Sequence, residues 1–246
     1  MSDHASVIVA CSRCVLSSGL RAREGALACI AMKILLRRVA MLCLPLLSLL
    51  LMSAPAGAQH KGEPDKFDFY LLNLSWSPEF CSIRGASPQC AARPGFVVHG
   101  LWPQNNDGSY PVFCSHRHGP KHPEQNLDIT PDLSLLGHEW TKHGTCTTMS
   151  PDEFFAAEHR AFHSLKIPEF FETLDREVLL KPSEILGMFA KANPSFPEGS
   201  IVLSCGNNRL TAIEACLAKD DLRPIACQGL RGCRAQVVRI TPVGRK

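Results

Sequence analysis

The chain has 246 residues, 45% of them hydrophobic, which is enough for a packed core in one large domain or two small ones. Its formal net charge of +3 arises from the first 58 residues, because residues 59–246 contain 20 Lys and Arg against 21 Asp and Glu. This balance excludes a polycation that holds nucleic acid through a broad basic face, so any contact with nucleic acid should lie in a local cleft.

The N-terminal region has the pattern of a secretory signal peptide that starts at Met32. A basic segment is followed by an apolar run over residues 39–52 and by the cleavage-site sequence Ala-Gly-Ala at residues 56–58. A membrane anchor is the competing interpretation, but the run is shorter than the roughly 20 residues that span a bilayer, and it contains Pro45. We therefore predict a signal peptide over residues 32–58 that is removed on export.

The segment before Met32 is polar and would displace the basic part of the signal from the start of the protein. Translation is therefore expected to begin at Met32, with residues 1–31 a start-site artefact. The mature chain would then be residues 59–246, the size of one domain, in the periplasm or the extracellular medium. We expect it to be a monomer without membrane contact.

The mature chain keeps eight of the twelve cysteines, an even number in an exported and therefore oxidising setting. Four disulfides are predicted, but the spacing alone leaves their pairing open. A zinc site is the alternative, although no CxxC spacing remains in this part of the chain, which argues against metal ligation. The eight residues are Cys81, Cys90, Cys114, Cys146, Cys205, Cys216, Cys227 and Cys233.

Two apolar segments near the start of the mature chain predict strands. The first covers residues 67–76, and the second covers residues 95–101 and contains His99. Residues 103–131 are rich in Asn, Gly, Pro and His, and they predict a long surface loop pinned by Cys114.

Helices are predicted in the middle of the chain and strands at its end. Thr130 and Pro131 would open a helix that ends at Gly144, and Ser150 with Glu153 forms a capping box for the next helix. The order of strands, helices and strands predicts an α+β fold with a mainly antiparallel central sheet and packed helices. The remaining expected elements are helices over residues 168–180 and 183–192 and strands over residues 201–204, 209–217 and 235–241.

Two motifs carry the chemistry: FVVHGLWPQ at residues 96–104 and HEWTKHGTC at residues 138–146. The second begins like the zinc motif HExxH, but its second histidine comes one residue late. On a helix His138 and His143 would stand about 140° apart and could not face one metal ion. We therefore expect no metal and no other cofactor.

Helical spacing instead pairs His138 with Lys142. The same spacing pairs Glu139 with His143, so Glu139 should orient this imidazole and raise its pKa. Lys142 can stabilise negative charge on a phosphate. With His99 from the strand, two imidazoles could act as base and acid on opposite sides of a phosphorus, without a metal.

Each of these residues also has a structural interpretation. A histidine in an apolar strand is more often a hydrogen-bonded core residue, and Glu139 with Lys142 could be a solvated pair worth a few tenths of a kcal/mol. Trp140 is expected in the core, whereas Trp102 could equally be a core residue or stack on a nucleobase. Three loop histidines are interpreted as exposed polarity rather than a metal site: His116, His118 and His122.

The two motifs resemble the active-site segments of the ribonuclease T2 family, HGLWP and HExxKHGxC, which are present here unbroken. LSWSPEFC at residues 74–81 is similar to the first strand and loop of the bacterial periplasmic members, and the resemblance extends over residues 69–233. It implies an endoribonuclease that turns the 2′-hydroxyl of RNA on the neighbouring phosphate and leaves a 2′,3′-cyclic phosphate. DNA lacks this hydroxyl and should not be cleaved.

The resemblance also implies roles for the motif residues. His143 would be the general base and His99 the general acid. Glu139 and Lys142 would stabilise the pentacoordinate phosphorane. The implied substrate-binding residues are His138 and Trp102.

For the cysteines, the resemblance implies the pairs Cys81 with Cys90, Cys114 with Cys146, Cys205 with Cys233, and Cys216 with Cys227. Plant relatives have Gln where this chain has Ser75, so their base preference cannot be carried over. The alternatives are a secreted RNA-binding protein that has lost cleavage and a hydrolase of another phosphodiester. The intact His99 and His143 favour catalysis.

Overall fold

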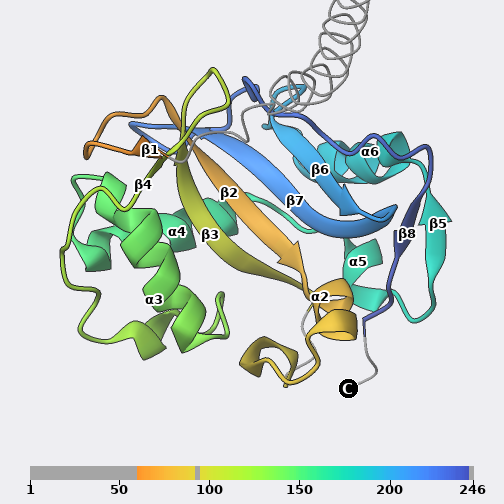
Figure 1. Ribbon diagram of the computed structural model, residues 1–246. Coiled ribbons are helices and arrows are strands. Elements are labelled where there is room, and N and C mark those ends of the chain that lie inside the picture. The colour runs from red at the N-terminus through yellow and green to blue at the C-terminus, as the bar shows by residue number, and fades with distance from the viewer. Residues whose placement is uncertain (1–59, 92–94, 244–246) are drawn as a thin grey trace, which may run out of the picture. The chain divides into compact units, whose positions relative to one another are not determined.

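The central sheet joins two strands from the first half of the chain to strands near its end (Figure 1). The computed structural model describes residues 60–91 and 95–243, and in it the strands lie in the order β3-β2-β7-β8-β5, with β6 also paired to β7. Four of the strand pairs in this sheet are antiparallel, and β7 runs parallel to β8. The strands are β1 (His60–Lys61), β2 (Phe69–Trp76), β3 (Phe96–Gln104), β4 (Pro111–Val112), β5 (Val178–Leu180), β6 (Ile201–Gly206), β7 (Arg209–Ala218) and β8 (Val238–Ile240).

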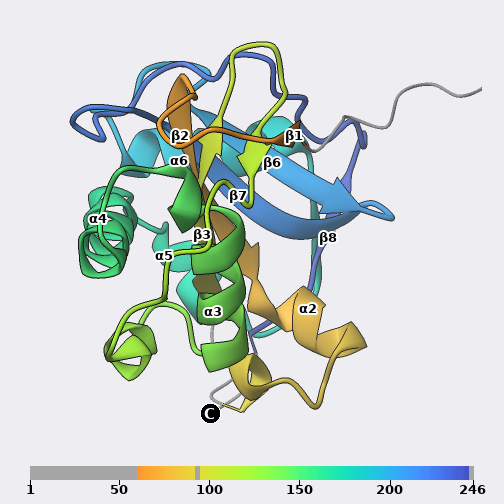
Figure 2. The same ribbon diagram turned by 60° about the vertical axis from the view of Figure 1, so that its left-hand side comes forward.

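Helices cover one face of this sheet and the edge beside β3. Helices α4, α5 and α6 lie behind the sheet in Figure 1, and α3 lies next to β3 in both Figure 1 and Figure 2. The predicted α+β fold with a mainly antiparallel sheet is confirmed. The helices are α2 (Ser77–Ile83), α3 (Leu133–Lys142), α4 (Pro151–Ser164), α5 (Glu169–Thr173) and α6 (Pro182–Ala192), with short 3-10 turns at Pro88–Cys90, Pro123–Asn126 and Gly144–Cys146.

Alternation along the strands divides their side chains between two apolar clusters. Leu72 and Leu74 of β2 and Ile213 of β7 belong to the main core, which α4, α5 and α6 cover. On the opposite face Phe69, Leu71 and Cys216 form a smaller cluster under a loop that contributes Ile225, Cys227 and Leu230.

The helix that carries the second motif begins slightly later than predicted. Its N-cap is Asp132 rather than Thr130, because the Asp132 carboxylate accepts hydrogen bonds from the backbone N–H groups of Ser134 and Leu135. The capping box of Ser150 and Glu153 at the start of α4 is confirmed.

Some elements differ from the sequence-based prediction. The helix expected over residues 168–180 is shorter, because α5 ends at Thr173. Residues 178–180 instead form β5, which pairs with β8. The long loop after β3 contains the short strand β4, which pairs with residues 60–61. Helix α2, directly after β2, was not predicted.

All four disulfides have the predicted pairing: Cys81–Cys90, Cys114–Cys146, Cys205–Cys233 and Cys216–Cys227. Within the described ranges, none of the helices has the length and apolar character needed to cross a bilayer. The predicted start-site artefact and signal peptide fall outside those ranges.

Candidate active site

His99 stands at a bulge in β3. Gly100 pairs with Asn73 and Val98 pairs with Leu74, so His99 is the extra residue on its strand. A bulge re-aims a side chain relative to the regular alternation of a strand. The neighbouring Val98 is fully buried, whereas the His99 side chain is 42% exposed. His99 is therefore accessible from solvent rather than enclosed in the core.

Glu139 lies between the two motif histidines. Its Oε1 atom is 3.6 Å from His99 Nε2, and its Oε2 atom is 4.0 Å from His143 Nε2. Trp102 Nε1 donates a hydrogen bond of 2.6 Å to Glu139 Oε2. The Glu139 side chain is only 2% exposed. One buried carboxylate thus connects residues of both motifs.

Gly100 permits this close approach of α3 to β3. A Cβ atom at this position would overlap Glu139 Oε2 and Trp102 Nε1. The backbone of Gly100 is an ordinary strand residue, so space rather than an unusual dihedral angle requires glycine here. The glycine of the first motif is thereby explained by the carboxylate of the second.

His143 follows the last residue of α3 and is almost completely buried. Its ring stacks on Trp102 with a centroid distance of 5.3 Å and an interplanar angle of 25°. Its Nδ1 atom has no hydrogen-bond partner among the described residues. The ring is therefore held by packing against Trp102 and faces the Glu139 carboxylate with its Nε2 atom.

Burial controls the protonation of the three central groups. It raises the pKa of Glu139 to about 7, against the opposing effects of the Trp102 hydrogen bond and the Lys142 charge. Although the His99 side chain is 42% exposed, partial removal of its ring from water lowers its pKa to about 4, and His138 and Lys142 act in the same direction. Burial also lowers the pKa of His143 to about 2, with further lowering by Lys142, His138 and His99.

The expectation that Glu139 raises the pKa of His143 is therefore wrong. Removal of the imidazole from water outweighs the attraction of a carboxylate 4.0 Å away, which is itself buried and drawn toward its neutral form. In the free protein His143 is a neutral imidazole.

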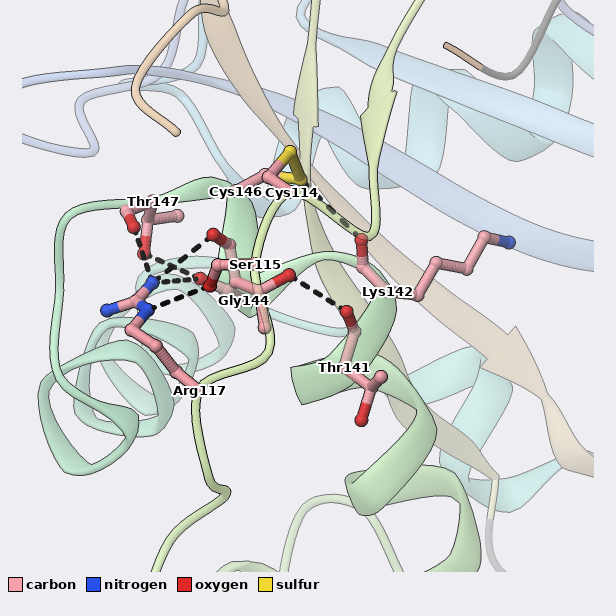
Figure 3. The surroundings of a disulfide bond; sticks show 9 residues. Cys114, Ser115, Arg117, Thr141, Lys142, Gly144, Cys146 and Thr147 are labelled. Atoms are coloured by element: carbon pink, nitrogen blue, oxygen red, sulfur yellow. Dashed lines mark hydrogen bonds between the residues drawn. A yellow bond between two sulfur atoms is a disulfide. The ribbon is translucent and has the colours of Figure 1, made fainter. Parts of the chain in front are cut away.

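Lys142 supplies positive charge at the edge of this group, and burial together with this charge lowers the pKa of His138 below its ordinary value. His138 is exposed, and Lys142, one helical turn later, is half-buried. Figure 3 shows the Lys142 side chain extending away from the nearby disulfide. Because the Lys142 charge lowers the pKa values of both His99 and His138, a positive potential reaches the position where an anion could bind.

Arg117 and a disulfide fasten the turn that follows His143, as Figure 3 shows. Its guanidinium donates to the backbone carbonyls of Gly144, Thr145, Thr147 and Met149, at distances from 2.6 to 3.3 Å. It also lies over the Trp140 ring, 5.0 Å from the centroid. The Cys114–Cys146 disulfide joins the same turn to the loop after β4.

Sequence reasoning did not find Arg117, because its acceptors are backbone atoms about 30 residues further along the chain. Trp140 lies in the core, as predicted. Of the loop histidines, His122 pairs with Glu124 at 3.2 Å. Across the described part of the chain, no three His, Cys, Asp or Glu side chains are grouped so that they could hold a metal ion.

The chain is similar to known proteins in sequence and in fold. The model of the Ribonuclease T2 family matches residues 67–227. The chain is 45% identical to a ribonuclease of Aeromonas hydrophila over 101 residues, which are 40% of this chain and 46% of that protein, so less than half of that relative is covered. It is 29% identical to ribonuclease DdI of Dictyostelium discoideum over 215 residues, 76% of this chain and 92% of that protein.

Among solved structures, the fold is similar to a mutant of RNase MC1, a ribonuclease from bitter gourd seeds, in complex with 5′-UMP. The TM-score is 0.58 at 22% identity, and the match covers 70% of this chain and 97% of that one. At this identity the likeness concerns the fold.

Proposed function

The chain belongs to the ribonuclease T2 family, and on that premise we propose that it is an endoribonuclease that cleaves single-stranded RNA without a metal ion. The reaction would be attack of a ribose 2′-hydroxyl on the adjacent phosphorus, with release of a 5′-hydroxyl and formation of a 2′,3′-cyclic phosphate. The observation that carries the proposal is the single carboxylate of Glu139 between the imidazoles of His99 and His143. DNA should be inert because it has no 2′-hydroxyl.

His143 is proposed as the general base that accepts the proton of the 2′-hydroxyl. This role requires a neutral imidazole, and burial keeps the pKa of His143 low, so the ring is unprotonated in the free protein. The stacking on Trp102 fixes the plane of the ring. A base held in one orientation reduces the entropy lost on reaching the transition state.

His99 is proposed as the general acid that gives a proton to the leaving 5′-oxygen. Its exposed ring is open to substrate, and the proton it needs is favoured once a phosphate anion lies beside it. Glu139 Oε1, 3.6 Å from His99 Nε2, would stabilise the protonated ring. In this step His143 would gain the proton of the 2′-hydroxyl and His99 would lose one to the 5′-oxygen, so the pair together holds the same number of protons before and after.

Lys142 and Glu139 are proposed to stabilise the phosphorane, and His138 to bind the phosphate. The positive charge of Lys142 suits the extra negative charge of a pentacoordinate phosphorus. Because burial raises the pKa of Glu139 to about 7, a fraction of this carboxyl is protonated near neutrality and can donate a hydrogen bond to a phosphate oxygen. Trp102 would contact a base with the part of its ring that His143 does not cover.

The same proposal includes export of the chain. The mature enzyme would be residues 59–246, released by a signal peptide at residues 32–58 into the periplasm or the medium, as a monomer. The four disulfides of the described residues suit an oxidising compartment.

The test is incubation of the oxidised mature chain, in excess EDTA, with single-stranded RNA and with DNA of the same sequence. We expect RNA products with 2′,3′-cyclic phosphate ends, identified by mass, and intact DNA. The variant His143→Ala should lose nearly all cleavage while it keeps the circular dichroism spectrum of the wild type. Cleavage that needs a metal ion, or full activity of this variant, would refute the mechanism.

A further inference from the structure

Three polar side chains lie on neighbouring strands of the sheet beside the candidate active site. We call Asn73 of β2, Ser204 of β6 and Glu214 of β7 the polar row. Asn73 Nδ2 donates a hydrogen bond of 2.9 Å to Glu214 Oε1, and the Ser204 side chain also hydrogen-bonds to Glu214. Glu214 and Ser204 are half-buried, and Asn73 is buried. They lie on the face of the sheet opposite to α4, α5 and α6 (Figure 1).

The polar row adjoins the catalytic carboxylate. Asn73 is the register partner of Gly100 on one side and of Glu214 on the other. Residues that pair directly across antiparallel strands point to the same face, and the side of Gly100 where a Cβ would stand is occupied by Glu139. Glu214 is two strand spacings from Gly100, which is about 10 Å. This separation is within the reach of a nucleobase whose phosphate lies at Glu139.

The apolar cluster beside it does not account for the carboxylate at position 214. Its neighbours along the same face, Leu71 and Cys216, are apolar and pack in the smaller cluster. Burial raises the pKa of Glu214, so this side chain is costly where it stands.

The free acceptors of Glu214 define what it could bind. An ionised carboxylate has about four lone-pair positions, and the hydrogen bonds from Asn73 and Ser204 leave acceptor capacity on the group. Bases of single-stranded RNA are read on their Watson–Crick edges. Guanine presents two adjacent N–H donors there, whereas adenine and cytosine each present a donor beside an acceptor, and uracil presents one donor between two acceptors.

We propose that Glu214, oriented by Asn73 and Ser204, binds the Watson–Crick edge of a guanine that flanks the cleaved phosphate. The site therefore selects guanine at one of the two nucleotides around the cleavage point. This inference rests on the proposed nuclease function for its biological meaning, but the binding of the base does not require cleavage.

The first experiment measures binding of mononucleotides to the mature, oxidised chain by calorimetry. The probes are the 5′- and 3′-monophosphates of guanosine, adenosine, cytidine and uridine. We expect either 5′-GMP or 3′-GMP to bind at least about tenfold more tightly than the three other nucleotides of the same series. A factor of this size is what one bidentate hydrogen-bonded pair contributes to discrimination between bases. Equal affinities within both series would overturn the inference, whatever the variants do.

The second experiment uses Glu214→Gln with Glu172→Gln as a matched control. The amide oxygen of glutamine can still accept from Asn73 and Ser204, so the row stays bonded while the pair of free acceptors is lost. Glu172 is an exposed residue of α5, which packs on the other face. Glu214→Gln should remove the guanine preference and Glu172→Gln should keep it; a preference that survives in Glu214→Gln would overturn the inference.

Cleavage of the dinucleoside monophosphates that carry guanine on either side separates this inference from the nuclease proposal. Guanine-selective binding without any RNA cleavage would support the Glu214 site and refute the nuclease function. Cleavage of RNA with equal rates for all bases at both positions, together with equal binding, would refute the Glu214 site and leave the nuclease function standing.

Discussion

Replacement of Glu158 by methionine should stabilise the fold. Glu158 lies on α4 and is completely buried, and neither of its carboxylate oxygens has a hydrogen-bond partner among the described residues. Phe154 and Ala161 flank it on the buried face of the same helix. Burial raises its pKa well above the usual value, and the nearby Glu139 adds to the rise.

The size of the effect follows from the cost of unpaired polar groups. A buried group without a hydrogen bond costs about 1–3 kcal/mol, and methionine has a similar length without that cost. We therefore expect Glu158→Met to raise the free energy of unfolding by about 1–3 kcal/mol at neutral pH. For a domain of this size each kcal/mol corresponds to roughly 2–4 °C in Tm.

The gain should depend on pH in a direction that the raised pKa determines. The unfolded chain releases the Glu158 proton near the ordinary value of 4.5, whereas the folded chain keeps it to a higher pH. Between these two values the folded state binds more protons, so wild-type stability falls as pH rises, by at most about 1.4 kcal/mol per pH unit for this group. The variant lacks this loss, so its advantage should grow from pH 4 to pH 8.

Thermal unfolding followed by circular dichroism at pH 4 and at pH 8, with the disulfides intact, measures both quantities. Glu172→Met, at an exposed position on α5, serves as control and should change stability by less than about 0.5 kcal/mol. A lower Tm for Glu158→Met at pH 8, or an advantage that is the same at both pH values, would refute the reasoning.

Three other perturbations address the candidate active site and the turn that follows it. The pKa of His99 is lowered to about 4, so this proposed general acid loses its proton as pH rises. We therefore expect kcat/KM on RNA to be highest at acidic pH and to fall toward pH 8, and a maximum above pH 8 would contradict this. Gly100→Ala should displace the Glu139 carboxylate and lower kcat by about 100-fold while the fold is retained. A near-normal kcat would show that the position of this carboxylate is not critical. Arg117→Met should lower the free energy of unfolding by about 2–4 kcal/mol in guanidinium titrations, because four backbone carbonyls lose their donor. Arg117→Lys should recover only part of this loss, because lysine lacks the planar guanidinium. An effect of Arg117→Met below about 0.5 kcal/mol would contradict the role of Arg117 in holding this turn.

Local sequence patterns predicted several of the strands and helices around the two motifs. Strands β2 and β3 follow from short apolar runs, and α4 follows from the capping box of Ser150 and Glu153. The four-residue spacing of Glu139 and His143 predicted that they face one another on a helix. These signals act within a few residues along the chain, so the sequence contains them directly.

Only the tertiary structure decided features that depend on distant contacts. Residues 178–180 form a strand because β8, about 60 residues later, pairs with them. The pKa of His143 is lowered rather than raised because Trp102 and its surroundings remove the ring from water. The unpaired burial of Glu158 likewise depends on what α4 packs against. Burial and strand pairing are set by parts of the chain that lie far apart in sequence, so no local pattern contains them.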